Sequence, residues 1–185
     1  MELGFTEEQQ ILRSSVSSMC KEHSDLQSLR EIEDSDIGYS ENFWNQLLAL
    51  GLTGIAIPEE YGGSDFGITG MSVVLQECGK TLTPSPILAT SVLGVATINM
   101  LGSEEQKSNY LPKIVSGEVT TALAIDDGNH HNPFNVEATA KLDGDHWILN
   151  GKKVFVIEHC ENCAGHQWNT RHDPNKYKTK AIGGK

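Results

Sequence analysis

Thiol and imidazole side chains gather near the C-terminal end of the sequence, where Cys160 and Cys163 form a C-x-x-C pair followed by His166 and His172. Two thiolates and two imidazoles suffice for one tetrahedral zinc ion, although this spacing is tighter than in common zinc fingers. A low-pKa C-x-x-C pair can also carry out redox chemistry. The polar composition of residues 158–185 equally fits a disordered tail, a gene fusion or a shifted reading frame. The sequence leaves these alternatives open.

Charge divides the chain at about the same point. Residues 1–157 carry 9 Lys or Arg and 22 Asp or Glu, whereas residues 158–185 carry 5 and 3. Because phosphates would be repelled by such an acidic body, we expect no binding to nucleic acid or to an anionic bilayer. The other two cysteines, Cys20 and Cys78, fall on predicted helix faces as small buried hydrophobes, which favours a reducing compartment.

No run of 18 apolar residues occurs, so the sequence predicts no membrane span. The start Met1-Glu2-Leu3-Gly4 lacks the basic and apolar regions of a secretion signal. We therefore expect a cytoplasmic protein.

Apolar residues at helical spacing predict an all-α N-terminal half. Thr6 with Gln9, and Ser103 with Gln106, have the spacing of capping boxes, and Thr69 is a candidate N-cap. Pro112 should bend or stop the last helix. The predicted helices cover residues 7–23, part of 25–38, 40–50, 69–82, a central and mostly buried 87–101, and a segment that begins after Ser103.

The stretch between residues 47 and 64 should be a tight loop. Gly51 is placed for a left-handed helix cap, and Pro58 prevents the helix from resuming. Gly62 and Gly63 would let the backbone pass close to another segment.

The pattern changes to β after Gly117. Strands are predicted over residues 120–125, 136–142 and 146–157, with Asp143-Gly144 and Asn150-Gly151 as turn dipeptides. The fold class is therefore α+β: an N-terminal all-α helical domain (residues 1–117), an incomplete antiparallel β segment (residues 118–157) and an unrelated C-x-x-C tail (residues 158–185).

Two blocks carry a family resemblance: TEEQQILRSSV at residues 6–16 and LGLTGIAIPEEYGGS at residues 50–64. Together they resemble the N-terminal helical domain of the acyl-CoA dehydrogenase family, and the likeness extends over about residues 3–157. The tail departs from the family. Its Cys160 and Cys163 resemble the start of a selenoprotein-W-like, thioredoxin-type domain.

The resemblance implies FAD as cofactor, bound by two segments of the β domain. The first contains Leu123, Ile125, Asp126 and Asn132, where Asp126 replaces a family threonine and Asn132 a family serine. A carboxylate in place of a hydroxyl exchanges a donor for an acceptor. A polar loop that joins two strands is the alternative interpretation of this segment.

The second segment is Leu149–Ile157, which resembles the family strand that lies beside the flavin ring. Phe155 would provide a flat face for the isoalloxazine, next to Val156. Ile157 replaces a threonine that in the family can hydrogen-bond the ring. A core aromatic in a hairpin is the simpler alternative for Phe155.

The reaction that the resemblance implies is the α,β-dehydrogenation of acyl-CoA thioesters, with a carboxylate base from a C-terminal helical bundle. This sequence contains no such bundle, so we name no catalytic residue and expect no turnover by this chain alone. Glu59 and Glu60 are expected to be solvated loop residues. The alternative is a non-catalytic helical module that forms a homo-oligomer or binds a partner subunit.

Overall fold

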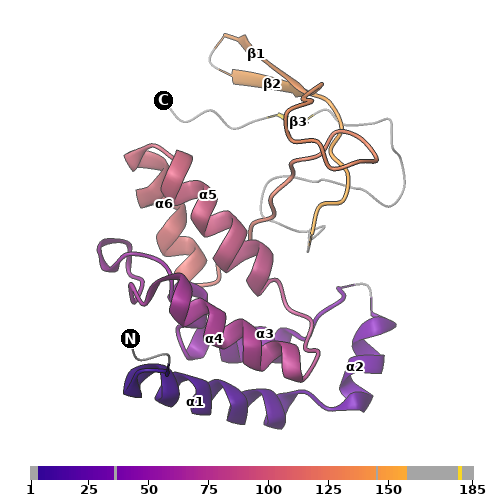
Figure 1. The fold of residues 1–185 in the computed structure, drawn as a ribbon. Helices are drawn as coiled ribbons and strands as arrows, with labels where there is room; N and C mark the ends of the chain where they lie inside the picture. The colour runs from indigo at the N-terminus through magenta and orange to yellow at the C-terminus, as the bar shows by residue number, and fades with distance from the viewer. Residues whose placement is uncertain (1–3, 36, 145, 158–178, 181–185) are drawn as a thin grey trace. The chain divides into compact units, whose positions relative to one another are not determined.

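The computed structural model describes residues 4–35, 37–144, 146–157 and 179–180. The chain divides into two compact units, Met1–Thr120 and Thr121–Lys185. The first is helical and the second holds a small antiparallel sheet, which confirms the α+β class (Figure 1). The three-part domain division expected from the sequence remains a prediction.

Helix α1, Glu7–His23, begins at the predicted capping box. Thr6 Oγ1 accepts from the Gln9 N–H at 3.2 Å, and Gln9 Oε1 accepts from the Thr6 N–H at 3.1 Å. Ser103 and Gln106 form the same reciprocal pair at the start of α6. Both predicted capping boxes are confirmed.

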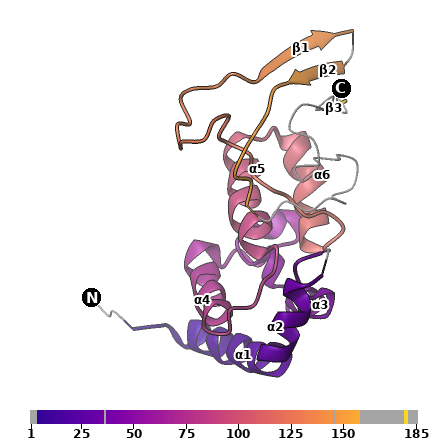
Figure 2. The ribbon, with the colours of Figure 1, turned by 90° about the vertical axis from the view of Figure 1, so that its right-hand side faces the viewer.

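The remaining helices follow the predicted order, with Ser40 capping α3. α1 and α4 lie side by side (Figure 1 and Figure 2). The elements are α2 (Leu26–Glu33), α3 (Glu41–Ala49), 3-10 turns at Leu52–Gly54 and Glu59–Tyr61, α4 (Gly67–Lys80), a π-helical stretch at Leu88–Gly94, α5 (Val95–Leu101) and α6 (Glu104–Val115).

Two helix boundaries differ from the prediction. Thr69 is not an N-cap, because α4 already begins at Gly67, whose φ of 70° turns the chain into the helix. Pro112 does not stop α6. Leu111 and Ile114, both fully buried, hold the helix in place on either side of the proline, so the chain stays helical to Val115 despite the lost N–H.

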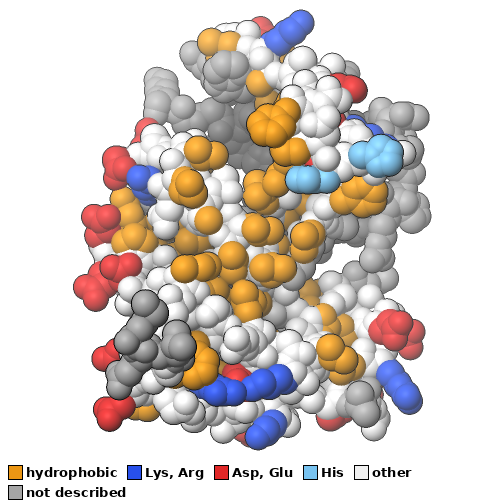
Figure 3. Space-filling view, viewed as in Figure 1, with side chains coloured by type: hydrophobic (Ala, Val, Ile, Leu, Met, Phe, Trp, Pro, Cys, Tyr) orange, Lys and Arg blue, Asp and Glu red, His pale blue; other side chains and the backbone are white. Residues whose placement is uncertain are grey.

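The helix over residues 87–101 is buried only in its first part. Ala89, Thr90 and Val95 are buried, but Met100 and Leu101 are 81% and 80% exposed. Hydrophobic side chains gather on the face that α5 presents in Figure 3. The expectation of a mostly buried helix was therefore wrong for its C-terminal end.

The glycine loop after α3 behaves as its sequence indicates. Gly51 adopts a left-handed φ of 68°. A Cβ on Gly63 would lie 2.0 Å from the Ile57 carbonyl oxygen, so only glycine fits this close approach. Phe66 N–H donates to the Ile55 carbonyl at 2.8 Å, which closes the loop before α4.

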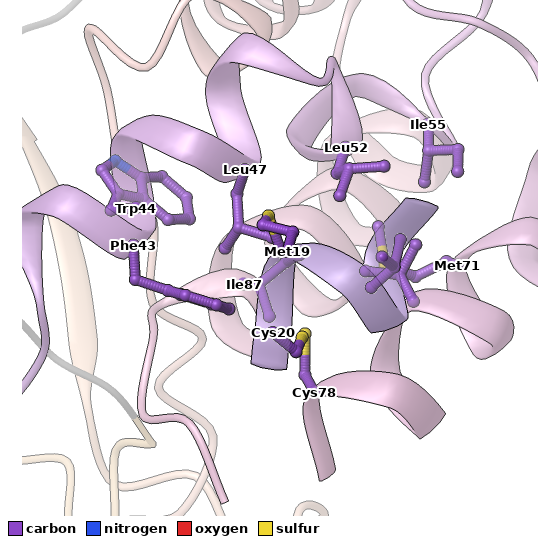
Figure 4. Close-up of a cluster of buried hydrophobic side chains, with 12 residues drawn as sticks. Met19, Cys20, Phe43, Trp44, Leu47, Leu52, Ile55, Met71, Cys78 and Ile87 are labelled. Carbon is purple, nitrogen blue, oxygen red and sulfur yellow. The ribbon is translucent and has the colours of Figure 1, made fainter. Parts of the chain in front are cut away.

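The helical unit has an apolar core whose main cluster is drawn in Figure 4. Fully buried side chains from α1, α3 and α4 meet there, among them Val16, Phe43, Leu47 and Met71. A second cluster joins Ile57, Val95, Leu111 and Ile114. Burial of this kind contributes roughly 1.5–3 kcal/mol per large side chain, so these helices carry their own stabilisation.

In the second unit, β1 (Thr139–Asp143) pairs with β2 (His146–Asn150), and Asp143 lies opposite His146 across the turn. Gly144, at φ 61°, provides the left-handed turn residue. β2 also pairs with β3, Thr179–Lys180. Every residue of β1 is exposed.

The strand predictions were too long. Residues 120–125 are not part of the sheet, β1 starts at Thr139 rather than residue 136, and β2 ends at Asn150 rather than residue 157. Strand propensity alone does not create a strand, because each strand needs a hydrogen-bonded neighbour. Asn150-Gly151 accordingly lies at the end of β2 and not in a hairpin turn between described strands.

Candidate functional site

The two segments predicted to face a flavin lie next to each other. Val154 N–H donates to the Asp126 carbonyl at 2.8 Å, and Lys153 Nζ donates to the Ile125 carbonyl at 2.8 Å. These bonds join residues 123–133 to residues 151–157 within the second unit. Residues far apart in the sequence thereby form one local surface.

Asp127 is the anchor of this arrangement. Its side chain is 3% exposed and its Oδ1 lies 2.7 Å from Lys153 Nζ, without the geometry of a directed hydrogen bond, so the contact is an ion pair. Asp127 Oδ2 accepts from the backbone N–H groups of Glu137 and Ala138. The Lys153 ammonium, followed by these N–H groups, lowers the pKa of Asp127 to about 2.

Asp126 is occupied within its own loop. Its Oδ2 lies 3.0 Å from His131 Nδ1, and its Oδ1 accepts from the Asn132 N–H at 3.1 Å. The contact with His131 is the main cause that lowers the pKa of Asp126, so this carboxyl stays ionised at neutral pH. Asp126 can therefore accept a hydrogen bond but cannot donate one, as the replacement of threonine implied.

Phe155 is not a core residue. Its ring is 72% exposed and its backbone has a φ of 54°, a left-handed conformation that is uncommon for an aromatic residue. Ile125 and Ile157 are also exposed, at 41% and 51%. The alternative interpretation, an aromatic side chain packed inside a hairpin, is wrong.

These side chains suit a flat, largely apolar flavin ring through their apolar surface but not through their hydrogen-bond donors. An unpacked aromatic and two isoleucines on adjoining segments provide apolar surface that a ring could cover. Leu123 and Val156 are partly buried. Asp126 offers no proton to the ring, so donors would have to come from backbone N–H groups.

A hollow of about 210 Å³ lies nearby in the same unit, lined by residues 138–140 and 149–151 and by Lys153. Of the predicted flavin residues, none lines it. It borders the hairpin and shares only Gly151 and Lys153 with the joined segments, so we assign it no role in the candidate site.

The sequence reasoning missed Asp127 and Lys153, which hold the two segments together. Both lie inside the two predicted flavin segments, directly beside Asp126 and Val154. A signal was available, since two consecutive aspartates in one segment and two consecutive lysines in the other offer complementary charges. Which of these residues are spatial neighbours could not be read from their order along the chain.

Cys160, Cys163, His166 and His172 lie outside the described residues, so the zinc and redox hypotheses for the tail stay predictions. Within the part of the chain that the structure describes, no group of His, Cys, Asp and Glu side chains could hold a metal ion. No described helix has both the length and the apolar character needed to cross a bilayer.

Comparison with known proteins identifies the class to which this fold belongs. The family model described as "Acyl-CoA dehydrogenase, N-terminal domain" matches residues 6–118. The chain therefore belongs to the acyl-CoA dehydrogenase family, as the resemblance of its two sequence blocks indicated.

Individual relatives agree with this assignment. Isovaleryl-CoA dehydrogenase, mitochondrial, of Bos taurus is 34% identical over 156 residues, which cover 83% of this chain and 37% of the relative. The chain thus spans less than half of that relative.

Solved structures of other proteins are also similar in fold. The ChsE4-ChsE5 complex from Mycobacterium tuberculosis matches with a TM-score of 0.74 and 26% identity, covering 84% of this chain and 42% of that one. An acyl-CoA dehydrogenase from Bacillus anthracis, solved in complex with FAD, matches with a TM-score of 0.72 and 25% identity, covering 82% and 27%.

Proposed function

We propose that this chain is the helical and flavin-facing part of an acyl-CoA dehydrogenase-type flavoprotein. One observation carries the proposal: the Val154 to Asp126 hydrogen bond places the two predicted flavin segments side by side. The family assignment supports it, and so does the FAD complex of the Bacillus anthracis relative. In this proposal the substrate class is an acyl-CoA thioester and the location is cytoplasmic.

The residues of this chain would hold the cofactor rather than perform the chemistry. Phe155 would cover one face of the ring, with Ile125, Val156 and Ile157 as apolar neighbours. Leu123 would add to this apolar surface, and backbone N–H groups of the loop between Asp126 and Asn132 would supply donors. Bound FAD provides the hydride acceptor for the dehydrogenation.

The ion pair of Asp127 with Lys153 has a positioning role in this proposal. It neutralises a carboxylate that is almost fully buried, and Lys153 also ties down the carbonyl of Ile125. We propose no described residue as the base that removes the α-proton.

FAD titration tests the proposal. We expect the purified chain to quench FAD fluorescence in a saturable way. Phe155→Ala should raise the dissociation constant for FAD by about tenfold, the equivalent of one lost aromatic stacking contact. Leu142→Ala is the matched control, because this side chain is also exposed (62%) in the same unit but lies on β1. Wild-type protein that FAD does not bind, or equal losses in both variants, would contradict the flavin assignment.

A second function is favoured by the exposed apolar side chains of the helical unit. Met100 and Leu101, at the end of α5, are 81% and 80% exposed. Exposure of this kind marks an interaction surface. We propose that the chain self-associates or binds a partner subunit through it, and the ChsE4-ChsE5 relative is such a complex.

Sedimentation velocity tests the interaction surface. We expect wild-type protein at micromolar concentration to sediment as an oligomer, and a Met100→Lys, Leu101→Lys double variant to sediment as a monomer with unchanged helical circular dichroism. A Ser108→Lys, Asn109→Lys variant at exposed positions of α6 is the charge-matched control. A clean wild-type monomer would rule out self-association and leave only a separate partner to be sought.

A further inference from the structure

Two buried thiols in the helical unit have no part in the proposed function. Cys20 on α1 and Cys78 on α4 are both free, and their exposed fractions are 0% and 5%. Their Sγ atoms lie 3.9 Å apart, and Figure 4 shows the two sulfurs facing each other within the core.

The two cysteines lie on helices that pack against each other in the core. Cys20 lies in the last turn of α1, which ends at His23, and Cys78 lies in the last turn of α4, which ends at Lys80. A disulfide brings two sulfurs to about 2.0 Å and spans helices that are already in close contact. The remaining approach is roughly 2 Å, which rotation of the two short side chains can supply without moving either helix far.

The surface lies close to this pair. Thr81, directly after α4, donates to the Cys78 carbonyl at 3.1 Å, and its hydroxyl lies 2.6 Å from that of Thr83. Thr83 in turn lies 2.6 Å from Ser24, directly after α1. Leu82 between the two threonines is 75% exposed, with a left-handed φ of 54°. A local opening of this short segment would admit a small oxidant to the thiols.

The contact between the thiols makes them unequal. A hydrogen bond with Cys78 lowers the pKa of Cys20, while the same contact and burial raise the pKa of Cys78. Cys20 is therefore the thiol that ionises first and acts as the nucleophile, and Cys78 is the thiol that follows.

We propose that Cys20 and Cys78 are a redox modification site, which a hydroperoxide converts to a reversible disulfide between α1 and α4. The Cys20 thiolate attacks a peroxide oxygen, the O–O bond breaks, and one water or alcohol leaves as Cys20 becomes a sulfenic acid. The Cys78 sulfur then attacks the Cys20 sulfur, the S–O bond breaks, and water leaves with the Cys78 proton. Two thiols are oxidised by two electrons and the peroxide is reduced. A dithiol reductant reverses the change by thiol exchange.

The link would close the chain between residues 20 and 78. Everything between them, including α2, α3 and the glycine loop, would be enclosed in one covalent loop. Such a link stabilises the folded state mainly by restricting the unfolded chain. The oxidised protein should therefore unfold at a higher temperature than the reduced protein.

Peptide mapping tests the site directly. The full chain carrying Cys160→Ser and Cys163→Ser is treated with hydrogen peroxide, remaining thiols are blocked with N-ethylmaleimide, and the protein is digested with trypsin. Cys20 lies in the tryptic peptide 14–21 and Cys78 in the peptide 31–80. We expect these two to appear joined, about 2 Da below the sum of their reduced masses, and to separate after dithiothreitol. Recovery of both peptides blocked by N-ethylmaleimide, or Cys20 oxidised without a link, would overturn the proposal.

Matched variants and thermal unfolding provide the second readout. In the same background, peroxide should raise the unfolding midpoint by at least about 5 °C, and dithiothreitol should reverse the shift. Cys78→Ala and Cys20→Ala should each abolish the shift, and both keep a small apolar side chain in the core. A shift that persists in either variant would place the oxidation elsewhere. If peroxide lowered the unfolding midpoint of the parent but not of the variants, the link would form at the expense of packing. That result would contradict the stabilising link proposed.

Discussion

The helical unit and the second unit of this protein are each stabilised internally by different interactions. Fully buried side chains such as Phe43, Leu47 and Val74 fill the core of the helices. In the second unit every residue of β1 is exposed, and the described loop segments are tied mainly by backbone hydrogen bonds and by the ion pair of Asp127 with Lys153. The first unit is built by apolar burial and the second by polar contacts.

This difference separates stability from the candidate function. Burial supplies most of the free energy of folding, so stability should reside in the helical unit. The residues proposed to hold a flavin belong to the unit with little core of its own. A short exposed sheet is marginal by itself, which means that its geometry depends on specific contacts and on whatever covers it.

The largest expected effect is on the helical core. Phe43→Ala should lower the free energy of unfolding by about 3–5 kcal/mol, because it leaves a large cavity at a fully buried site. Leu142→Ala, at an exposed position of β1, should change it by less than about 0.5 kcal/mol. Urea unfolding followed by helical circular dichroism measures both. Comparable losses in the two variants would remove the distinction between the units.

The next effect concerns the charge buried in the helical unit. Glu77 is 2% exposed and binds Lys80 Nζ at 2.6 Å and Arg13 Nε at 2.9 Å, and these partners lower its pKa below the ordinary 4.5. The pKa of Glu77 is lower in the folded protein than in the unfolded protein. The ion pairs therefore stabilise the fold above pH 4.5, and this contribution is lost as pH falls through the folded pKa.

Glu77→Gln should therefore lower the free energy of unfolding by about 1–3 kcal/mol at pH 7 and by much less near pH 3. The measurement is the urea midpoint of both proteins between pH 7 and pH 3. Glu60→Gln, in the exposed loop before Tyr61, is the control and should leave the profile unchanged. Parallel profiles for wild type and Glu77→Gln would show that the ion pairs contribute nothing to stability.

A smaller effect is expected at the helix caps. Thr6→Ala should lower the free energy of unfolding by about 1 kcal/mol, because an N–H group at the start of α1 loses its acceptor. Thr6→Ser keeps the hydroxyl and should retain most of the stability. Chemical unfolding of the two variants separates the cap from a general effect of substitution, and equal losses would argue against the capping box.

The smallest global effect is expected in the second unit. Asp127→Asn should leave the unfolding midpoint of the helices unchanged, since the ion pair ties only loop segments. Hydrogen exchange at the Glu137 and Ala138 amides, which donate to Asp127, should become several-fold faster. Unchanged exchange at these amides would mean that the loop is held by other contacts.

Local sequence determined much of this protein. The spacing of Thr6 and Gln9, the φ required at Gly51 and the periodicity of the helices are properties of short segments, so the order of residues was sufficient to predict them. The family blocks at residues 6–16 and 50–64 also identified the class to which the chain belongs. The choice of flavin residues stays a prediction.

Only the tertiary structure decided the features that depend on distant partners. The continuation of α6 through Pro112, the exposure of Met100 and Leu101, and the ends of the strands all follow from what each segment packs or pairs against. The same holds for the contacts of Cys20 with Cys78 and of Asp127 with Lys153. Periodicity and propensity report on neighbours within a few residues, whereas burial and pairing energies arise from residues that the fold alone brings together.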